Sequence, residues 1–563
     1  MPAIRLTLAS NANQSTKCPI LIPASASTNP TASSSVRALV FKSAQAKLRV
    51  KKPTRVFVGR SGQELVSEAD WKSNINNDVV LLVSAGEDYV GARKVSGVHA
   101  DANPQCPVEV LASEATLIEP LALTQLETTA RTLPGIIHAV GQPDLHPGTK
   151  FPIGAVFASK GWIHPPLIGG DIGCGMAWYK TTLNRSQVDG NKGKNVANQL
   201  RGLEGAWRNQ AYREKWLLDE DNCSISAGKQ WDAALGTIGA GNHFAEIQVV
   251  EGSGFAKSDD GLHQDDVVLL VHSGSRGLGG SILKKYTTDS RTSFPDDSED
   301  ANAYLEEHNK ACEWAKANRD LIALRFLACL EPGNEDWQLG DSNASDFGEE
   351  GITMIATAKA ALRKRKVVDI WHNNVECVAW PPPAPSSAAE EPTPERSLTE
   401  ALGQIALGDE NTPKEYVFLH RKGAAPTYDP KTQLPLGLLP LPGSRSTATL
   451  ILQPTFSEAN SWGLKNGLSL AHGAGRAMSR AKALQTLGKK YKGINLLEPN
   501  AEDPEGTWVI CDEKDLVFEE APWAYKTVQD VAADLVAAGA AKIIGWCCPR
   551  VSYKVRKELD LLR

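Results

Sequence analysis

The sequence predicts a globular protein that mixes helices with strands, with a tail, a small module and a large domain. Its 563 residues suggest two to four domains. A period of 3.6 residues among apolar side chains predicts helices over 301–330 and 527–540, whereas short apolar or alternating runs elsewhere predict strands. Hydrophobic residues make up 42% of the chain and charged residues 22%, which is typical of soluble proteins with a large core.

Composition also excludes several classes of protein. No run of eighteen apolar residues occurs, so we expect no membrane span and no membrane partner. The formal net charge is -6, so nucleic-acid binding would need a local basic groove. The ten cysteines include no Cys-x-x-Cys pair, which argues against a zinc knuckle or a disulfide framework and suits a reducing compartment. We therefore expect a cytoplasmic protein.

Residues 1–34 are rich in Ser, Thr, Ala, Asn and Pro and contain no acid. The first acidic residue of the chain is Glu64. This composition predicts a disordered tail. It is also typical of an organelle transit peptide, so organelle targeting is the alternative.

Residues 35–93 are expected to form a small β-rich module. The expected strands are 36–41, 55–58 and 79–83, with a turn at 59–62 and a helix beginning near Ser67. This pattern suggests a β-grasp-like roll of the ubiquitin or doublecortin kind. The module also carries a basic run that either contacts RNA or is a solvated strand face. The run consists of Lys47, Arg49, Lys51, Lys52 and Arg55.

The remaining residues, 94–563, carry all the motifs that indicate chemistry. A segment rich in Pro, Ala, Ser and Glu at 381–396 predicts a disordered insertion between motifs.

Six glycine-rich segments hold histidine, cysteine, acidic or arginine side chains. They are Pro143–Gly148, Gly170–Gly175, Gly241–Phe244, His272–Gly277, His420–Gly423 and His472–Arg476. Five of the eleven histidines lie in these segments, and a sixth, His372, follows an apolar run. Imidazole and thiolate bind borderline-soft cations, and glycine lets the backbone approach phosphate closely. The set therefore predicts a metal and nucleotide site assembled from distant parts of the chain.

Asp171 and Cys174 lie three residues apart on a predicted tight turn, after strand-like runs at 153–157 and 167–168. A carboxylate and a thiolate in this arrangement can share a metal ion, although taken alone the motif more often indicates a turn-capping Asp and a buried Cys. His243 adjoins a glycine-rich turn, and His272 ends a predicted strand at 267–271. Each histidine taken alone is more often a structural residue than a ligand. Three histidines with one Asp and one Cys would supply five ligands, enough for two adjacent divalent ions.

His472 is flanked by glycine and followed by Arg476 and Arg480 at helical spacing. This pattern predicts a turn that enters a helix and favours anions. An imidazole there is suited to attack phosphorus, and the alternative is a helix cap with solvated arginines. The chain has no phosphate loop of the Gly-x-x-x-x-Gly-Lys kind, no Lys-x-Asp-Gly and no Gly-x-Ser-x-Gly. Nucleotide chemistry would therefore depend on histidine.

The motifs, in their order, resemble those of the RtcB RNA ligases, and the resemblance covers roughly residues 97–556. The matching motifs are Pro-Asp-Leu-His-Pro-Gly, Asp-Ile-Gly-Cys-Gly, Gly-Asn-His-Phe, His-Ser-Gly-Ser-Arg-Gly, Trp-His-Asn, His-Arg-Lys-Gly-Ala, Pro-Gly-Ser and His-Gly-Ala-Gly-Arg. The resemblance implies an α+β fold in which a single large catalytic domain occupies 94–563.

The resemblance also implies the reaction, the cofactors and the site residues. Two Mn²⁺ ions and GTP would drive the joining of RNA 3′-phosphate or 2′,3′-cyclic phosphate ends to 5′-hydroxyl ends, in RNA repair or tRNA splicing. An archease-like activator is a further candidate partner. His472 would be the catalytic nucleophile that becomes guanylylated, and Arg276 and Arg476 are candidates for phosphate or RNA contacts. The implied metal ligands are Asp171, Cys174, His243, His272 and His372. The implied GTP-binding residues are Asn242, His243, Phe244, Ala245, Glu246, His372, Asn373, Pro442, Gly443, Ser444, Arg445, Thr449, His472, Gly473, Ala474, Gly475 and Lys554.

Some positions depart from the usual family pattern and resemble the release-factor-H-coupled branch, which is linked to repair of damaged RNA. The segment before Asp171 is short, Arg445-Ser446 stands where Met-Gly is common, and Val555 stands where Gly is usual. These departures motivate an alternative function, a metal-dependent 2′,3′-cyclic phosphodiesterase that processes RNA ends without ligation. A non-catalytic RNA-binding scaffold is the third hypothesis.

Overall fold

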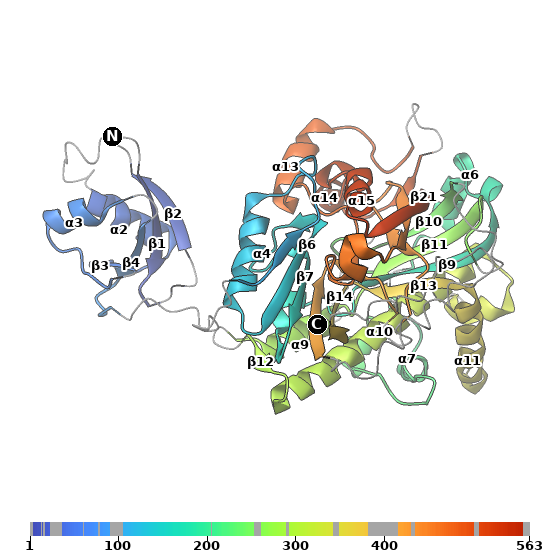
Figure 1. Ribbon diagram of the computed structural model, residues 1–563. Coiled ribbons are helices and arrows are strands. Elements are labelled where there is room, and N and C mark those ends of the chain that lie inside the picture. Colours follow the sequence, from blue (N-terminus) through green and yellow to red (C-terminus); the bar gives the residue numbers. More distant parts are fainter. Residues whose placement is uncertain are drawn as a thin grey trace. The chain divides into compact units, whose positions relative to one another are not determined.

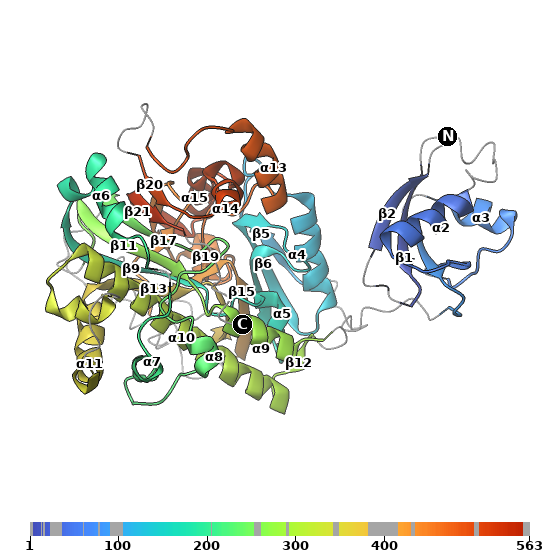
Figure 2. The ribbon, with the colours of Figure 1, turned by 180° about the vertical axis from the view of Figure 1, so that it is seen from behind.

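The structure is a computed structural model of the whole chain. It describes residues 4–12, 14, 17–22, 36–59, 61–76, 79–89, 105–203, 205–252, 261–288, 292–341, 348–380, 415–429, 434–499 and 506–554. The chain divides into two compact units, unit 1 at Met1–Val98 and unit 2 at His99–Arg563 (Figures 1 and 2). The insertion predicted at 381–396 lies outside the described residues. Within those residues, no helix is long and apolar enough to cross a membrane.

The described residues of unit 1 form a four-stranded sheet and two helices. Its elements are β1 (Ile4–Ser10), β2 (Lys17–Ile22), α2 (Val36–Lys47), β3 (Arg55–Val58), α3 (Glu68–Asn74) and β4 (Val79–Ser84). The strand order is β2-β1-β4-β3, with β1 and β4 parallel at the centre and the outer pairs antiparallel. Leu6 and Leu8 of β1 pack with Leu81 and Val83 of β4 and with Val40 of α2 to form the core.

Two expectations for this unit are wrong. The tail predicted at 1–34 contains β1 and β2, because alternate apolar residues of β1 are buried and its backbone pairs with β2 and β4. Removal of 1–34 as a transit peptide would therefore delete two of the four strands. The segment 36–41 begins helix α2 instead of forming a strand, since Val40 and Ala44 bury one helical face. The expectations for β3, α3 and β4 are confirmed, and Ser67 caps α3. The β-grasp assignment stays a prediction.

The main sheet of unit 2 lies between two hydrophobic cores. Its order is β13 (Lys366–Trp371), β9 (Gly175–Asn184), β11 (Asp266–Ser273), β10 (Phe244–Glu251), β21 (Ala541–Tyr553), β18 (Thr449–Pro454) and β17 (Leu439–Leu441), all antiparallel, and β20 (Trp508–Ile510) runs parallel to β21. In β11, Leu269 and Val271 face one core, whereas Val268 and Leu270 face the other. Helix α10 (Glu299–Leu330) contributes to the first core and α15 (Val528–Ala537) to the second.

A second sheet of unit 2 has the order β14 (Asn373–Trp380), β15 (Glu415–Lys422), β7 (Ile153–Ser159), β6 (Ile136–His146) and β5 (Val108–Val110). Helix α4 (Pro120–Thr132) packs against β6 and buries Leu126 and Ala130 there. A single residue, His372, separates β13 of the main sheet from β14 of the second sheet. The two sheets therefore meet at His372.

The described residues of unit 2 also form shorter elements. The strands are β8 (Trp162–Ile163), β12 (Phe294–Pro295), β16 (Ala424–Pro426) and β19 (Ser469–Ala471). The helices are α5 (Pro165–Ile168), α6 (Asn191–Gln199), α7 (Gln210–Trp216), α8 (Lys229–Asp232), α9 (Gly277–Tyr286), α11 (Gly348–Arg365), α13 (Arg480–Lys490), α14 (Lys514–Glu519), and the 3₁₀ turns η1 (Arg185–Gln187), η2 (Glu335–Gly340), η3 (Glu458–Gly463) and η4 (Pro522–Ala524).

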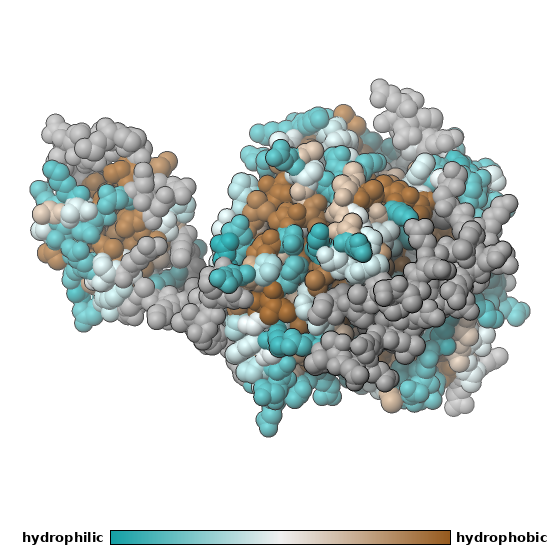
Figure 3. Space-filling model, in the orientation of Figure 1, coloured by the Kyte–Doolittle hydropathy of each residue, from teal (hydrophilic) through white to brown (hydrophobic). Residues whose placement is uncertain are grey.

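The longest periodic runs of unit 2 match the structure. The helices predicted at 301–330 and 527–540 are α10 and α15, and the strands predicted at 153–157 and 267–271 are β7 and β11. The prediction of a strand at 167–168 is wrong, because these residues belong to α5, which begins with two prolines at its first helical positions. On the face seen in Figure 3, hydrophilic and apolar residues are interspersed over both units.

Candidate metal and nucleotide site

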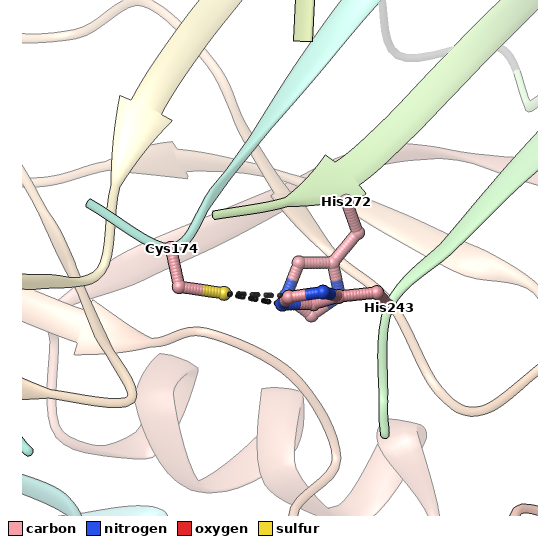
Figure 4. A group of neighbouring side chains, drawn as sticks. All are labelled: Cys174, His243 and His272. Atoms are coloured by element: carbon pink, nitrogen blue, oxygen red, sulfur yellow. Dashed lines mark hydrogen bonds between the residues drawn. The ribbon is translucent and has the colours of Figure 1, made fainter. Parts of the chain in front are cut away.

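Cys174, His243 and His272 converge because they lie at the same end of three neighbouring strands (Figure 4). Cys174 directly precedes β9, His243 directly precedes β10, and His272 is the last residue but one of β11. The Cys174 Sγ lies 3.2 Å from Nε2 of His243 and 3.4 Å from Nε2 of His272. All three residues are buried, and together they could hold a metal ion.

The other two predicted metal ligands join this cluster. His372 reaches it from the junction of the two sheets, with its Nε2 3.2 Å from Cys174 Sγ and 3.3 Å from Nε2 of His272. The Oδ2 of Asp171 lies 2.9 Å from Nε2 of His243. The predicted tight turn is present, since the backbone N–H of Cys174 donates to the carbonyl of Asp171. The structure therefore brings all five predicted ligands together.

The chemistry of this donor set fits a cation. The Nδ1 of His243 lies 3.2 Å from the carbonyl of Ile238, so it carries the proton and the Nε2 lone pair faces Cys174. The Nε2 atoms of three imidazoles gather around one sulfur, while Nδ1 of His272 and His372 is buried without a partner. A cation among these atoms would accept their lone pairs, so the donor set suits a metal ion. Burial raises the pKa of the Cys174 thiol, and a bound divalent ion would favour the thiolate.

Arg319 of α10 binds the backbone next to Cys174 and next to His272, a role that the sequence did not predict. One guanidinium nitrogen donates to the carbonyls of Gly173 and Ser273, at 3.0 and 2.9 Å. The side chain also pairs with Asp369 of β13 at 2.7 Å. The sequence contains one indication of this role. Arg319 falls among the buried positions of the predicted helix, where a charged side chain without a partner would destabilise the fold.

His472 pairs with a carboxylate. Its Nδ1 lies 2.7 Å from Oδ2 of Asp144, which is buried on β6. An ionised carboxylate only accepts hydrogen bonds, so Nδ1 donates and the lone pair of Nε2 stays free. The His472 ring lies 4.6 Å from the ring of His372, so this histidine adjoins the metal-type cluster. The segment that contains Asp144 stood out in the sequence, but nothing local paired it with a histidine 328 residues away.

The predicted helix entry at His472 is wrong. His472 follows β19, and α13 begins only at Arg480, where the Ser479 side chain caps it. Arg476 and Arg480 instead donate to the buried carboxylate of Glu520, at 3.2 and 2.9 Å. Nearby cations hold the pKa of Glu520 below its usual value despite its burial. The two arginines are therefore fixed in place by an acid that the sequence did not single out.

A cavity of about 580 Å³ lies beside the cluster and His472. The charged lysine, arginine and acidic residues that line it among the described residues are Lys422, Arg445, Arg476, Arg480, Lys554 and Asp171. Cations therefore predominate strongly over acids at this wall, although the whole chain is acidic. Such a cavity favours a phosphate-bearing ligand.

Most residues predicted to bind the nucleotide line this cavity. They are Asn242, Phe244, His372, Asn373, Pro442, Gly443, Ser444, Arg445, His472, Gly473, Ala474, Gly475 and Lys554. His243, Ala245, Glu246 and Thr449 lie behind the wall. Glu246 accepts from the backbone N–H of Ser446 at 3.2 Å, and burial raises its pKa to about 7. It therefore supports the loop that contains Ser444 and Arg445.

The motif at His420–Gly423 divides between the core and the cavity. His420 and Arg421 are buried, and Arg421 pairs with Glu376. Lys422 and Gly423 line the cavity. A Cβ at position 423 would meet Cε1 of the His472 ring at 2.9 Å, and the backbone there has φ +67, so glycine makes room for the imidazole.

Arg276 is not among the cavity-lining residues. Its guanidinium lies behind the cluster, 3.4 Å from Nδ1 of His243. The guanidinium also packs against Gly239, where a side-chain Cβ would collide with it. Its role in phosphate or RNA contact stays a prediction.

The fold and the site define a mixed helix-and-sheet protein in which a cysteine–histidine cluster that could hold a metal ion lies beside a cavity lined mainly by cationic side chains. The model of the family described as tRNA-splicing ligase RtcB matches residues 125–209, 203–339 and 404–555. This chain belongs to the RtcB family.

Curated relatives match over most of their length. The RNA-splicing ligase RtcB2 of Escherichia coli is 35% identical over 77% of this chain and 91% of its own. The tRNA-splicing ligase RtcB of Methanococcus maripaludis is 28% identical over 71% of this chain and 84% of its own. The RNA-splicing ligase RtcB homolog 1 of Entamoeba dispar is 25% identical, over 74% and 78% respectively.

Proposed function

We propose that this protein is an RNA ligase that uses GTP and Mn²⁺ to join RNA 3′-phosphate or 2′,3′-cyclic phosphate ends to 5′-hydroxyl ends, in RNA repair or tRNA splicing. The observation that carries the proposal is one cavity lined by His472, whose ring pairs with the buried Asp144, and by residues of the Cys174 cluster. Family membership supports the same reaction class. A cytoplasmic location and an archease-like activator stay predictions of the resemblance.

The proposed metal ligands are Asp171, Cys174, His243, His272 and His372. Imidazole and thiolate suit several borderline divalent ions, and the choice of manganese rests on the family resemblance. Bound ions would neutralise the negative charge that develops on the transferred phosphate.

The chain's own nucleophile would be Nε2 of His472. Asp144 holds the Nδ1 proton, so the Nε2 lone pair is available to attack the α-phosphorus of GTP. An N–P bond forms as the bond to pyrophosphate breaks. The guanylyl group then passes to the RNA 3′-phosphate, the 5′-hydroxyl attacks that phosphorus, and GMP leaves. A cyclic phosphate end would first be hydrolysed to the monophosphate.

The cationic wall of the cavity would bind the phosphates. Lys422 has a pKa lowered by burial, and no described residue forms an ion pair with it. Lys554 donates to the carbonyl of His243 at 3.2 Å, and burial lowers its pKa to about 8. Binding of an anionic ligand would favour the charged form of both lysines.

The test uses an RNA with a 5′-hydroxyl and a 2′,3′-cyclic phosphate, incubated with Mn²⁺ with and without GTP. We expect a joined product that requires both additions. Conversion of the cyclic end to a monophosphate with no joined product, even with GTP, would contradict ligation and favour the phosphodiesterase alternative.

A further inference from the structure

Charge is divided unequally between the two units. Residues 1–98 contain 13 Lys and Arg against 6 Asp and Glu, a formal charge of +7. The whole chain contains 60 and 66, so residues 99–563 contain 47 and 60, a formal charge of -13. A polyanionic substrate is therefore repelled by the average charge of unit 2 and attracted by that of unit 1.

The cations of unit 1 are concentrated on α2 and on the segment that follows it. Helix α2 carries Arg37, Lys42 and Lys47 and no acid. The segment from Lys47 to Lys52, which we call the basic loop, carries four cations and leads into β3. All six of these side chains are exposed, and they are Arg37, Lys42, Lys47, Arg49, Lys51 and Lys52.

Three acids of unit 1 have partners outside α2 and the basic loop. Glu64 and Asp88 both pair with Arg55 on β3, at 2.8 and 2.6 Å. Asp70 accepts from the backbone N–H of Ser67 in the capping box of α3, which lowers its pKa. Among the described residues, none forms an ion pair with the six exposed cations of α2 and the basic loop. No ion pair among the described residues of the unit therefore neutralises their charge.

The backbone of the basic loop is strained at two of its cations. Arg49 has φ 55 and Lys52 has φ 50, in the left-handed region that glycine and asparagine adopt at lower cost. Stability alone favours glycine or asparagine at both positions. Cationic side chains at both positions are instead consistent with a requirement for charge there.

We propose that the basic loop, with Arg37 and Lys42 of α2, binds the phosphate backbone of RNA. Unit 1 then raises the affinity of the whole chain for RNA independently of base sequence, and it takes no part in bond making or breaking. The choice of RNA as the polyanion rests on the proposed function. A tethered basic unit also raises the local concentration of RNA for the rest of the chain.

The test compares two full-length variants with equal changes in net charge. The first replaces Lys47, Arg49, Lys51 and Lys52 by Gln. The control replaces Lys192, Lys229, Lys310 and Lys364 by Gln, four exposed lysines dispersed over unit 2. The affinity for a single-stranded RNA with a 3′-phosphate is measured by fluorescence anisotropy at several salt concentrations. Thermal unfolding of both variants confirms that they are folded.

We expect the basic-loop variant to bind RNA at least about tenfold more weakly at low salt, and the control variant to bind nearly as wild type. The slope of log affinity against log salt should fall by about 0.7 for each phosphate contact that is lost. The KM for RNA in ligation should rise with little change in kcat, and labelling of the protein by GTP without RNA should be unchanged.

Equal effects of the two variants, or an unchanged salt slope in the basic-loop variant, would overturn the proposal. Loss of binding to vesicles of anionic phospholipid, with RNA binding intact, would overturn it in favour of a lipid surface. Failure of the proposed ligation is a separate result, because wild-type protein would then lack GTP labelling whatever its affinity for RNA.

Discussion

The Oδ2 of Asp144 lies 2.7 Å from Nδ1 of His472 and holds the proton on the side of the imidazole that faces away from the free Nε2 lone pair. The two residues come from β6 and from the loop after β19. An aspartate in this position fixes the tautomer that a histidine nucleophile requires.

Asp144→Asn keeps the size of the side chain but can stabilise the wrong tautomer of His472. We expect the rate of GTP labelling to fall by about 10² to 10⁴, by analogy with the loss of an orienting aspartate in other histidine-dependent sites. Single-turnover labelling with α-labelled GTP measures the rate, and Mn²⁺ binding should be unchanged. A labelling rate within twofold of wild type would show that Asp144 does not orient the nucleophile.

Cys174→Ser tests the metal-type centre. Cys174 Sγ contacts the imidazoles of His243, His272 and His372. We therefore expect the affinity for Mn²⁺ to fall by at least about 10²-fold, which is more than the usual loss when a residue that only hydrogen-bonds to a metal ligand is changed. Cys312→Ser is the matched control, since Cys312 is also buried but lies outside the cluster. Metal content after gel filtration decides the question, and equal metal content in the two variants would contradict the assignment.

Arg319→Met removes the guanidinium that binds the backbone next to Cys174 and next to His272. It leaves Asp369 buried without its main partner, so we expect a loss of stability of about 3–5 kcal/mol. We also expect roughly 10- to 100-fold weaker metal binding by the folded protein. Arg325→Met is the control, because Arg325 is buried on the same helix but donates to Gly236 instead. If both variants bind metal equally, the role of Arg319 is stability alone.

Gly423→Ala places a methyl group against the His472 ring. The residue also has a positive φ, so we expect a loss of stability of about 1–2 kcal/mol together with slower labelling by GTP. Gly488→Ala is the control, since the space around that helical position is open and alanine should stabilise α13 by about 0.5–1 kcal/mol. Faster or unchanged labelling in Gly423→Ala would contradict the steric argument.

Buried histidines make stability depend on pH. Burial lowers the pKa of His308 to about 4 and that of His420 to about 3. In the unfolded chain both rings take up a proton below about pH 6.5, so between that pH and about pH 4 the unfolded state binds more protons. Stability should therefore fall as pH decreases through this window. In His420→Gln, the free energy of unfolding measured with urea should fall less steeply with decreasing pH, by up to about 1.4 kcal/mol per pH unit. The same pH dependence in the variant and in wild type would contradict this role of His420.

The sequence predicted the elements whose signal is local. Helix α10 and strand β11 followed from periodicity, and the family motifs indicated the five residues of the cluster around Cys174. Helix α2 was mistaken for a strand because β-branched and aromatic residues at 36–41 hide a four-residue spacing of buried positions.

The missed parts depend on tertiary contacts. Asp144 and Glu520 acquire their partners only when strands and loops far apart in sequence meet, so no local pattern assigns them. The same holds for the position of Arg276 behind His243, which neither its spacing nor its charge reveals.

The most direct test of the central claim is incubation with α-labelled GTP and Mn²⁺, followed by denaturing electrophoresis. Wild type is compared with His472→Ala and with His263→Ala, which changes an exposed histidine. We predict a labelled band in wild type and in His263→Ala that is absent from His472→Ala. Equal labelling of His472→Ala, or no label in wild type with any nucleotide, would contradict nucleotidyl transfer through His472.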